Sequence, residues 1–298
     1  MPVSTYPGDA ASELGSLREW IGRREVRGEV LNPDQAIKLG AMLNSSGPLA
    51  AGDGCLAVPV HWLYHLPFAP TSAIGDDGHP NSGGLLPPLS RLRRMWASSR
   101  ITAEGPPLKL NTFVRKESVI TEIQSKRGIS GDLLFIHIEH TLFSDSGPHL
   151  HELQQIVYRD AAPSASAPAN VRVARRDEVW SQTITATPVL LFRYSALTLN
   201  SHRIHYDRSY AVSSEGYQGL VVQGPLIATL LLEFAYGIRP GLRAVKFSFK
   251  AIRALIEGQP FQLCAVPLSE KSGLSLWVRD HEGFVTTEAC VEFNNVKS

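Results

Sequence analysis

The chain has 298 residues, of which 43% are hydrophobic and 19% are charged. This length accommodates two modules of ordinary domain size, and the composition supports a buried core, which excludes an intrinsically disordered chain. Lys and Arg (29 residues) nearly balance Asp and Glu (28 residues), leaving a formal charge of +1. We therefore expect neither nucleic acid nor a membrane surface as a partner.

The three cysteines, Cys55, Cys264 and Cys290, are far apart and form no CxxC pair. We interpret them as reduced thiols and expect neither a disulfide framework nor a structural zinc site. Residues 1–16 lack the basic and apolar segments of a secretory signal, and the apolar stretch 225–236 is too short to cross a bilayer. A cytoplasmic protein is expected, or a mitochondrial one if the source is a eukaryote.

In the first half, a helix is predicted over 33–43, opened by Asn32, and the aromatic segment 60–66 is a candidate central helix. The long Gly/Pro stretch 70–88 is interpreted as functional, because compact domains seldom keep such a loop for packing. Strands are predicted at 108–114, 118–125, 133–143 and 152–158.

An Ala/Ser/Pro-rich segment, 161–170, has no apolar periodicity and is interpreted as a linker. It divides the chain into a predicted N-terminal domain, residues 1–159, and a predicted C-terminal domain, residues 173–298. The second half repeats the scheme of the first only at the level of architecture.

The second half begins with a predicted strand at 182–191 and a polar, His-rich loop with a short helix at 200–213. A helix is predicted over 225–238, because apolar residues recur there at helical spacing, Pro225 suits a first turn and Gly237 suits an end. Further strands are predicted at 244–250, 260–267, 274–280 and 283–294. A helix followed by consecutive strands predicts an α+β fold in which an antiparallel sheet wraps around the helix.

The densest group of chemically active side chains lies between Tyr194 and Asp207, which includes Asn200, His202, Arg203 and His205. Imidazole suits proton transfer to and from water near neutral pH. By composition alone, a polar loop with satisfied histidines explains this segment equally well.

The string Leu197-Thr-Leu-Asn-Ser-His-Arg-Ile-His-Tyr-Asp207 resembles the hydratase motif of MaoC-like proteins, Leu-Thr-Gly-Asp-x-Asn-Pro-Leu-His. The resemblance implies a double hotdog fold with a degenerate N-terminal module and a catalytic C-terminal module. In this alignment His205 matches the catalytic histidine, and Asn200 stands where the family has its catalytic aspartate. Since a carboxamide cannot transfer protons, either Asn200 only positions water or another carboxylate substitutes, of which Asp207 is the nearest in sequence.

Further strings are similar to one branch of that family, which contains itaconyl-CoA hydratase, mesaconyl-C4-CoA hydratase and the type 2 hydroxyacyl-thioester dehydratases. These strings are Gly219–Pro225, His61–Pro67, Gly83–Pro88 and Arg93–Trp96. The resemblance implies an enzyme that adds water to a 2-enoyl-CoA or removes it, without a metal or redox cofactor.

Gly224 precedes Pro225 at the predicted helix start, where free backbone N–H groups and the helix dipole favour negative charge. Hydration of an enoyl thioester builds negative charge on the thioester oxygen, so Gly224 or a residue just after Pro225 is a candidate oxyanion donor. An ordinary Gly-Pro helix start explains the same residues.

Cations near the motif lead us to expect a short dicarboxylic acyl-CoA, with Arg193, His202 and Arg203 facing its second carboxylate. The basic groups Arg91, Arg93, Arg94 and Arg100, and Lys246, Lys250 and Arg253, are candidates for contact with a CoA phosphate. The complete set of predicted substrate-binding residues is Arg193, His202, Arg203, Tyr206, Val222, Gln223, Lys250 and Arg253. No metal site is expected, because the remaining histidines offer no third ligand.

Three other functions stay open. A 3-hydroxyacyl-carrier-protein dehydratase of fatty-acid synthesis would need an apolar tunnel and a basic rim. A non-catalytic acyl-CoA-binding protein would agree with Asn200 in place of an acid, and a thioesterase would agree with the fold alone. A homodimer or larger homo-oligomer is expected.

Overall fold

The computed structural model describes residues 17–45, 47–50, 52–81, 84–89, 93–128, 131–159, 171–268 and 272–295. The predicted linker, residues 161–170, and Arg91 lie outside the described residues. The division into domains at 159 and 173 therefore stays a prediction. No helix among the described residues has the length and hydropathy that a membrane crossing requires.

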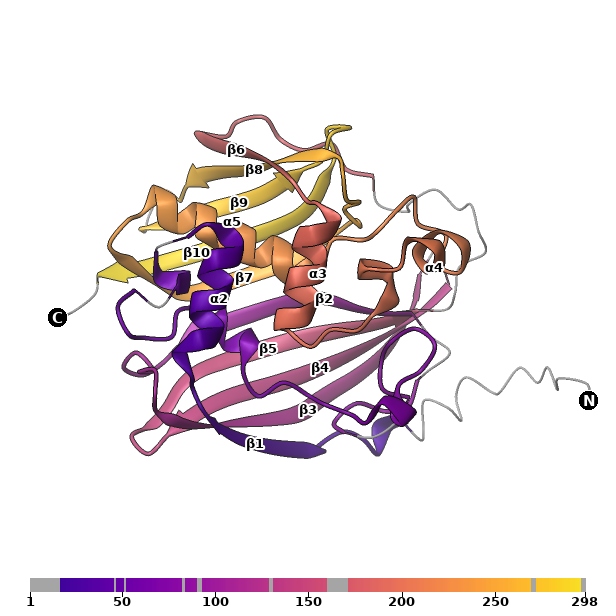
Figure 1. Ribbon diagram of the computed structural model, residues 1–298, viewed down its shortest axis with the longest axis horizontal. Helices are drawn as coiled ribbons and strands as arrows, with labels where there is room; N and C mark the ends of the chain where they lie inside the picture. Colours follow the sequence, from indigo (N-terminus) through magenta and orange to yellow (C-terminus); the bar gives the residue numbers. More distant parts are fainter. Residues whose placement is uncertain are drawn as a thin grey trace, which may run out of the picture.

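A single antiparallel sheet of ten strands dominates the fold (Figure 1). The N-terminal half contributes β1 (Arg24–Val30), β2 (Arg93–Ala103), β3 (Phe113–Gly128), β4 (Gly131–Ser144) and β5 (Gly147–Arg159). The C-terminal half contributes β6 (Trp180–Thr185), β7 (Leu242–Ala251), β8 (Pro260–Pro267), β9 (Gly273–Arg279) and β10 (Val285–Asn295). The halves meet where β2 pairs with β7, with Arg100 opposite Ser248.

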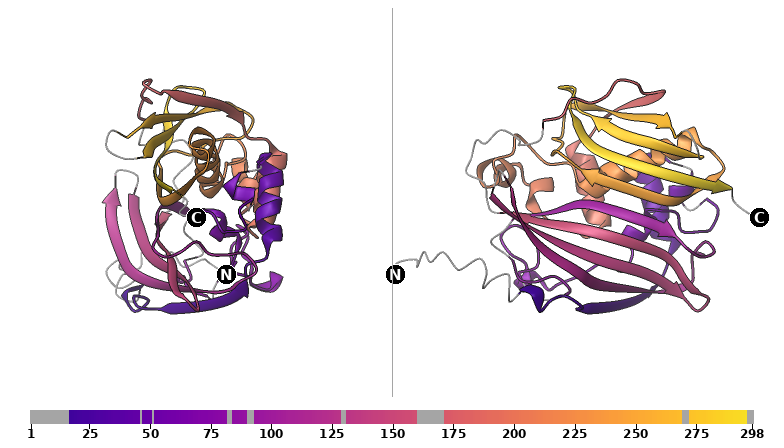
Figure 2. Two further views of the ribbon diagram at one scale, coloured as in Figure 1. Left: turned by 90° about the vertical axis from the view of Figure 1, so that its left-hand side faces the viewer. Right: turned by 180° about the vertical axis from the view of Figure 1, so that it is seen from behind.

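The two halves have the same strand order. Read from its outer edge inwards, the first half runs β1-β3-β4-β5-β2 and the second runs β6-β8-β9-β10-β7. Each strand thus has a counterpart at the same place in the other half, which confirms the predicted architectural repeat and the double hotdog fold. The sheet curves around the helices, which lie on one side of it (Figure 2).

The helices begin and end where local sequence dictates. They are α2 (Pro33–Leu43), α3 (Pro188–Leu197), α4 (Arg208–Ser213) and α5 (Gly224–Ile238), with 3-10 turns η1 (Pro48–Ala50), η2 (Val60–Leu63), η3 (Thr71–Ala73) and η4 (Arg203–His205). Helix α2 is capped by the Asn32 side chain, which accepts the N–H of Asp34 at 2.9 Å, and it closes at Asn44 with a positive φ of 55°. The predicted helix over 225–238 is confirmed with a start one residue earlier.

Three predicted elements differ from the structure. The strand predicted over 108–114 is a loop as far as Thr112, with a single bridge between Lys109 and Cys55, and β3 begins only at Phe113. The strand predicted over 182–191 ends at Thr185, because Thr187 caps α3 through Leu190 N–H and Pro188 occupies its first turn. The candidate central helix over 60–66 is only the turn η2, because Tyr64 returns to extended backbone and His65 has a φ of 53°. Within the described residues, only the second half has a long helix, α5, that packs against the middle of its strands. The first half has the short turn η2 instead.

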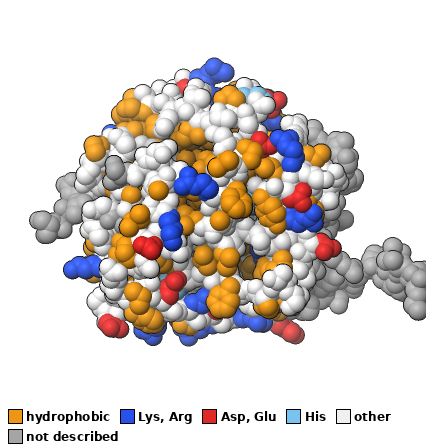
Figure 3. Space-filling model, in the orientation of Figure 1, with side chains coloured by type: hydrophobic (Ala, Val, Ile, Leu, Met, Phe, Trp, Pro, Cys, Tyr) orange, Lys and Arg blue, Asp and Glu red, His pale blue; other side chains and the backbone are white. Residues whose placement is uncertain are grey.

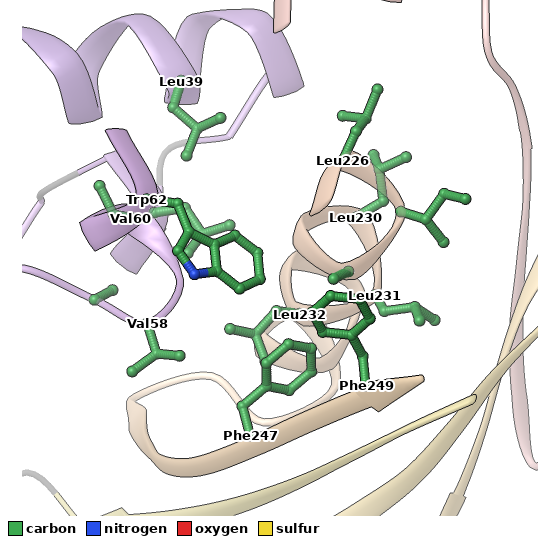
Figure 4. Close-up of a cluster of buried hydrophobic side chains, with 14 of the residues drawn as sticks. Leu39, Val58, Val60, Trp62, Leu226, Leu230, Leu231, Leu232, Phe247 and Phe249 are labelled. Atoms are coloured by element: carbon green, nitrogen blue, oxygen red, sulfur yellow. The ribbon is translucent and has the colours of Figure 1, made fainter. Parts of the chain in front are cut away.

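One hydrophobic core joins the halves around α5. Leu226, Leu231 and Leu232 of this helix are fully buried, and they lie in the same cluster as Leu39 and Trp62 of the first half. Figure 4 shows Trp62 directed at α5, with Phe247 and Phe249 of β7 next to the same helix, and the ring of Phe249 lies 5.8 Å from that of Trp62. The shared core fixes the first half against the segment that leads into α5, where the candidate site lies.

Candidate active site

His205 ends the turn η4, and only 7% of it is exposed. Its Nδ1 lies 2.7 Å from the carbonyl oxygen of Val221. Because a carbonyl only accepts hydrogen bonds, Nδ1 carries the proton and Nε2 keeps a free lone pair. Burial lowers the pKa of His205 to about 4, so the ring is a neutral base at pH 7.

Asn200 shapes the loop that carries His205. Its side-chain oxygen accepts the backbone N–H of His202 at 3.1 Å, and its own N–H donates to the carbonyl of Ser195 at 2.8 Å. Leu199, just before it, has a positive φ of 51°. Asn200 lines the same cavity as His205, where its carboxamide can hydrogen-bond a water molecule without transferring a proton.

The start of α5 forms the next part of the site. Gln223 is 1% exposed, and its side-chain nitrogen donates to the Leu191 carbonyl and to the Ser195 hydroxyl, each at 2.9 Å. These bonds anchor α5 on α3, while Gly224 lines the cavity. The first N–H groups of a helix have no acceptor within it, so this end offers donors and a partial positive charge to an anionic oxygen.

A cavity of about 1490 Å³ unites these residues with the N-terminal half. Its walls include His205 and Gly224 from the second half, and Arg94 of β2, Lys116 of β3 and Tyr158 of β5 from the first. Val222 is a buried wall residue whose N–H is already bonded to the Leu255 carbonyl. The cavity is large enough to hold a small-molecule ligand that carries an acyl group.

Three predicted substrate-binding residues are not brought to this cavity. Arg203 pairs with Asp207 at 2.7 Å and packs over the ring of Tyr210, while Arg193 and Tyr206 have exposed side chains. None of the three is among the cavity-lining residues within the described part of the chain. The proposed carboxylate contact of Arg193 and Arg203 therefore has no support from their positions.

His202 reaches the cavity, but not as a cation. Burial lowers its pKa to about 2, and the neighbouring His79 and His205 act in the same direction, so the ring is neutral at pH 7. Lys250 and Arg253 line the cavity, where Arg253 is paired with Glu282 at 2.7 Å, and their contact with a CoA phosphate stays a prediction. Asp207 does not face the site, since its carboxylate caps α4 through Tyr210 N–H and binds Arg203.

The sequence interpretation missed a group from the Gly/Pro stretch of the first half. Asp77 Oδ2 lies 3.0 Å from Nδ1 of His79, whose ring centroid is 4.2 Å from that of His202. The ring of His202 in turn lies 5.5 Å, edge-on, from that of His205. The unusual length and composition of this Gly/Pro stretch were the only sequence signal that it has a function. Its contacts could not be predicted, because its partner Ser201 lies 123 residues further along the chain.

Asp77, His79 and His202 each offer one donor atom within 4.8 Å of the others, a spacing at which a metal ion could be held. Asp77 and His79 are joined by a direct hydrogen bond, which does not require an ion. The expected absence of a metal site stays a prediction.

A second buried polar group borders the cavity from the first half. Glu152 is 1% exposed and accepts hydrogen bonds from His61 Nε2 at 2.8 Å, Trp62 Nε1 at 3.1 Å and the Ser99 hydroxyl at 2.5 Å. Burial alone would raise the pKa of Glu152, but the His61 hydrogen bond and the nearby charges of His61, His140 and Lys116 together outweigh it, and the pKa is lowered to about 2. Lys116, whose pKa burial lowers, lies near enough to act on this carboxylate.

The buried histidines predict that the fold weakens in mild acid. Burial lowers the pKa of His205 to about 4, of His140 to about 3 and of His202 to about 2, whereas an unfolded histidine titrates near 6.5. Between pH 6.5 and 4 the unfolded chain thus binds more protons, and the free energy of unfolding falls as the pH is lowered. We expect a loss on the order of 1 kcal/mol per histidine for each pH unit in this window.

Urea unfolding at pH 7.5, 6 and 5 measures this loss. In a His205→Gln variant the free energy of unfolding should depend less steeply on pH, because unfolding then takes up about one proton fewer. A free energy of unfolding that is constant across the three pH values would contradict the neutral, buried state of these rings.

The chain is similar along most of its length to known proteins of one family. The sequence model of the family described as hydroxyacyl-thioester dehydratase type 2 matches residues 59–257. A mesaconyl-C4-CoA hydratase of Chloroflexus aurantiacus is 39% identical over 275 residues, covering 92% of this chain and 96% of that protein. The mitochondrial hydroxyacyl-thioester dehydratase type 2 of Schizosaccharomyces pombe is 27% identical over 243 residues, covering 73% of this chain and 78% of that protein.

A crystal structure of a MaoC-like dehydratase from Phytophthora capsici has a TM-score of 0.64 at 12% identity, covering 93% of this chain and 97% of that one. This likeness concerns the fold alone and confirms the expected hotdog architecture. The family match and the bacterial relative confirm the expected enzyme class, a hydratase or dehydratase of acyl thioesters. The chain belongs to the hydroxyacyl-thioester dehydratase type 2 family.

Proposed function

We propose that this protein hydrates the double bond of a short dicarboxylic enoyl-CoA, with mesaconyl-C4-CoA favoured over itaconyl-CoA. The observation that carries the reaction is His205, a neutral imidazole with its proton held on Nδ1 by Val221, beside the open N-terminus of α5. The preferred substrate rests on the 39% identity with a mesaconyl-C4-CoA hydratase over 92% of the chain.

The reaction follows from three groups. His205 Nε2 takes a proton from water as the water oxygen attacks the β-carbon of the enoyl thioester. The double-bond electrons move toward the thioester, and the resulting enolate oxygen is stabilised by the N–H groups at Gly224 and the first turn of α5. The proton on His205 then passes to the α-carbon, which restores the neutral ring and leaves the hydroxyacyl thioester.

The CoA portion is assigned to the rim of the cavity, near Lys250 and Arg253. No metal or redox cofactor takes part in the proposed reaction. We also propose a homodimer. The face drawn in Figure 3 is rich in apolar side chains. More than half of each of three apolar side chains of the helices is exposed: Ile37 of α2, and Val189 and Phe192 of α3. Sedimentation at micromolar concentration tests the assembly.

Arg94 is our candidate for binding the free carboxylate of the substrate. It lines the cavity, lies opposite Tyr158 in the β2–β5 register and donates a hydrogen bond to the Tyr158 side chain. The charge of Arg94 lowers the pKa of both His79 and His202, so its guanidinium lies near the loop that carries His202 and His205. Among the described residues no carboxylate forms an ion pair with Arg94, which leaves its guanidinium available to a ligand.

Replacing Arg94 with glutamine is expected to lower kcat/KM for mesaconyl-C4-CoA by roughly 10–100-fold, the value of one or two charge-assisted hydrogen bonds. Crotonyl-CoA, which lacks the second carboxylate, should lose no more than about threefold. Arg193→Gln is the control, because Arg193 is exposed and outside the cavity lining. An equal loss on both substrates would refute carboxylate recognition by Arg94.

Ultraviolet absorbance of the conjugated enoyl thioester tests the proposed function with crotonyl-CoA, a longer 2-enoyl-CoA and mesaconyl-C4-CoA. Itaconyl-CoA is followed by chromatography of the product. The proposal requires turnover with the highest kcat/KM for mesaconyl-C4-CoA. A preference for the long-chain thioester would favour a fatty-acid dehydratase, and tight binding without any turnover would favour a binding protein.

A further inference from the structure

The first half of the chain is fastened to the loop that carries His205. The Ser201 hydroxyl donates to the Gly78 carbonyl at 2.5 Å, and the Arg203 N–H donates to the Asp77 carbonyl at 2.9 Å. Gly78 has a φ of 91°, and a Cβ atom on it would overlap the Ser201 carbonyl oxygen. The side chains on either side of Gly78, Asp77 and His79, are therefore held in fixed positions relative to His205.

Asp77 is an ionised carboxylate with a defined partner. Burial would raise its pKa, but the ring and backbone hydrogen bonds from His79, at 3.0 and 2.8 Å, outweigh it and the pKa is lowered to about 2. Because the carboxylate accepts, His79 carries its proton on Nδ1 and keeps the lone pair on Nε2. This is the arrangement in which a carboxylate fixes the tautomer and orientation of an imidazole.

The imidazole of His79 packs on His202, and His202 packs edge-on against His205, so three rings connect Asp77 with the catalytic base. All of these side chains line the cavity. The other carboxylates in the described lining are engaged elsewhere: Glu25 with Arg27, Glu152 with His61 and Glu215 with Arg93.

An attacking water molecule has two protons, and it is oriented only when each has an acceptor. Nε2 of His205 accepts the first. The side-chain oxygen of Asn200 accepts the His202 N–H and keeps one lone pair, whereas Asp207 is bound to Arg203 outside the cavity. The neutral ring of His202, held by His79 and Asp77, lies next to His205 and offers a further acceptor for the second proton.

We propose that Asp77 and His79 are positioning residues of the active site, which hold His202 and through it the attacking water opposite Nε2 of His205. This inference rests on the proposed hydration reaction. In the step, one water proton goes to His205, the oxygen bonds to the β-carbon, and the second proton stays on the new hydroxyl group. The His205 proton then passes to the α-carbon, so that no imidazole gains or loses a proton overall.

The test is a double-mutant cycle between the two loops. Asp77→Asn and His79→Gln should each lower kcat by roughly 10–100-fold with KM within about threefold, because a misplaced water costs rate rather than binding. Asn200→Asp places a carboxylate beside His205. In the Asp77→Asn background it should raise kcat at least about tenfold. A merely structural role of Asp77 would not respond to a carboxylate added at position 200.

Asp76→Asn is the matched control, since Asp76 is the neighbouring carboxylate with an exposed side chain outside the cavity lining. It should leave kcat unchanged. Wild-type-like kcat in Asp77→Asn, or a loss accompanied by a lower melting temperature and no rescue by Asn200→Asp, would overturn the inference. Loss of wild-type activity in EDTA, restored by zinc, would also overturn it in favour of a metal ion at Asp77, His79 and His202.

These outcomes separate the inference from the proposed function. If the wild-type protein turns over none of the enoyl-CoA panel, the hydration reaction itself is wrong. If the wild type is active and Asp77→Asn is equally active, only the role of Asp77 is wrong.

Discussion

Replacing His205 with glutamine is expected to lower kcat for enoyl-CoA hydration by roughly 10²–10⁴-fold, the usual contribution of a general base. Glutamine keeps an N–H donor for the Val221 carbonyl, but it has no lone pair of comparable basicity at the position of Nε2. The fold should persist, since the residue is a turn side chain with one hydrogen bond. Initial rates with mesaconyl-C4-CoA, together with far-UV circular dichroism, measure both effects.

The control for this variant is His281→Gln, which changes an exposed histidine outside the cavity lining. It should retain full activity. A His205→Gln protein that keeps more than about a tenth of the wild-type kcat would remove His205 from the role of base.

Replacing Glu152 with alanine is expected to lower the free energy of unfolding by about 3–5 kcal/mol. The change removes the common acceptor of His61, Trp62 and Ser99, and it leaves these buried donors unpaired beside the Lys116 ammonium. Because Trp62 is also part of the core around α5, the loss should reach both halves of the sheet. Urea or thermal unfolding measures it.

Glu139→Ala is the matched control for the stability effect. Glu139 also pairs with a histidine, His151 at 2.5 Å, but its side chain is 45% exposed. Solvent-exposed pairs contribute little, so the expected loss is below about 1 kcal/mol. Equal losses in the two variants would show that the Glu152 group does not stabilise the fold through its buried hydrogen bonds.

The elements that could be predicted from sequence are those with a simple periodicity. Helix α5 was found because its apolar residues surround the helix and Pro225 and Gly237 mark its ends. Strands β1 and β2 were missed. β1 carries charges on an edge strand, and β2 is polar although it lies inside the sheet, where Ser99 is buried by its bond to Glu152.

The candidate site was predictable only on the loop that carries the motif. His205, Asn200 and Gly224 are close in sequence to one another and do line one cavity. Asp77 and His79 could not be assigned, because the hydrogen bonds from Ser201 to Gly78 and from Arg203 to Asp77 depend on how the two halves pack. Arg203 was predicted to bind the substrate, because the sequence does not reveal that its guanidinium forms an ion pair with Asp207.

The proposed reaction is the addition of water across a conjugated acyl-CoA double bond. Incubation of the purified protein with mesaconyl-C4-CoA in ¹⁸O-labelled water, followed by mass spectrometry of the intact thioester, tests it most directly. We expect a hydrated CoA ester with one ¹⁸O atom on the β-carbon, and no such product with the His205→Gln variant. Release of free CoA with ¹⁸O in the carboxylate of the acid would instead identify a thioesterase and contradict the proposed hydration.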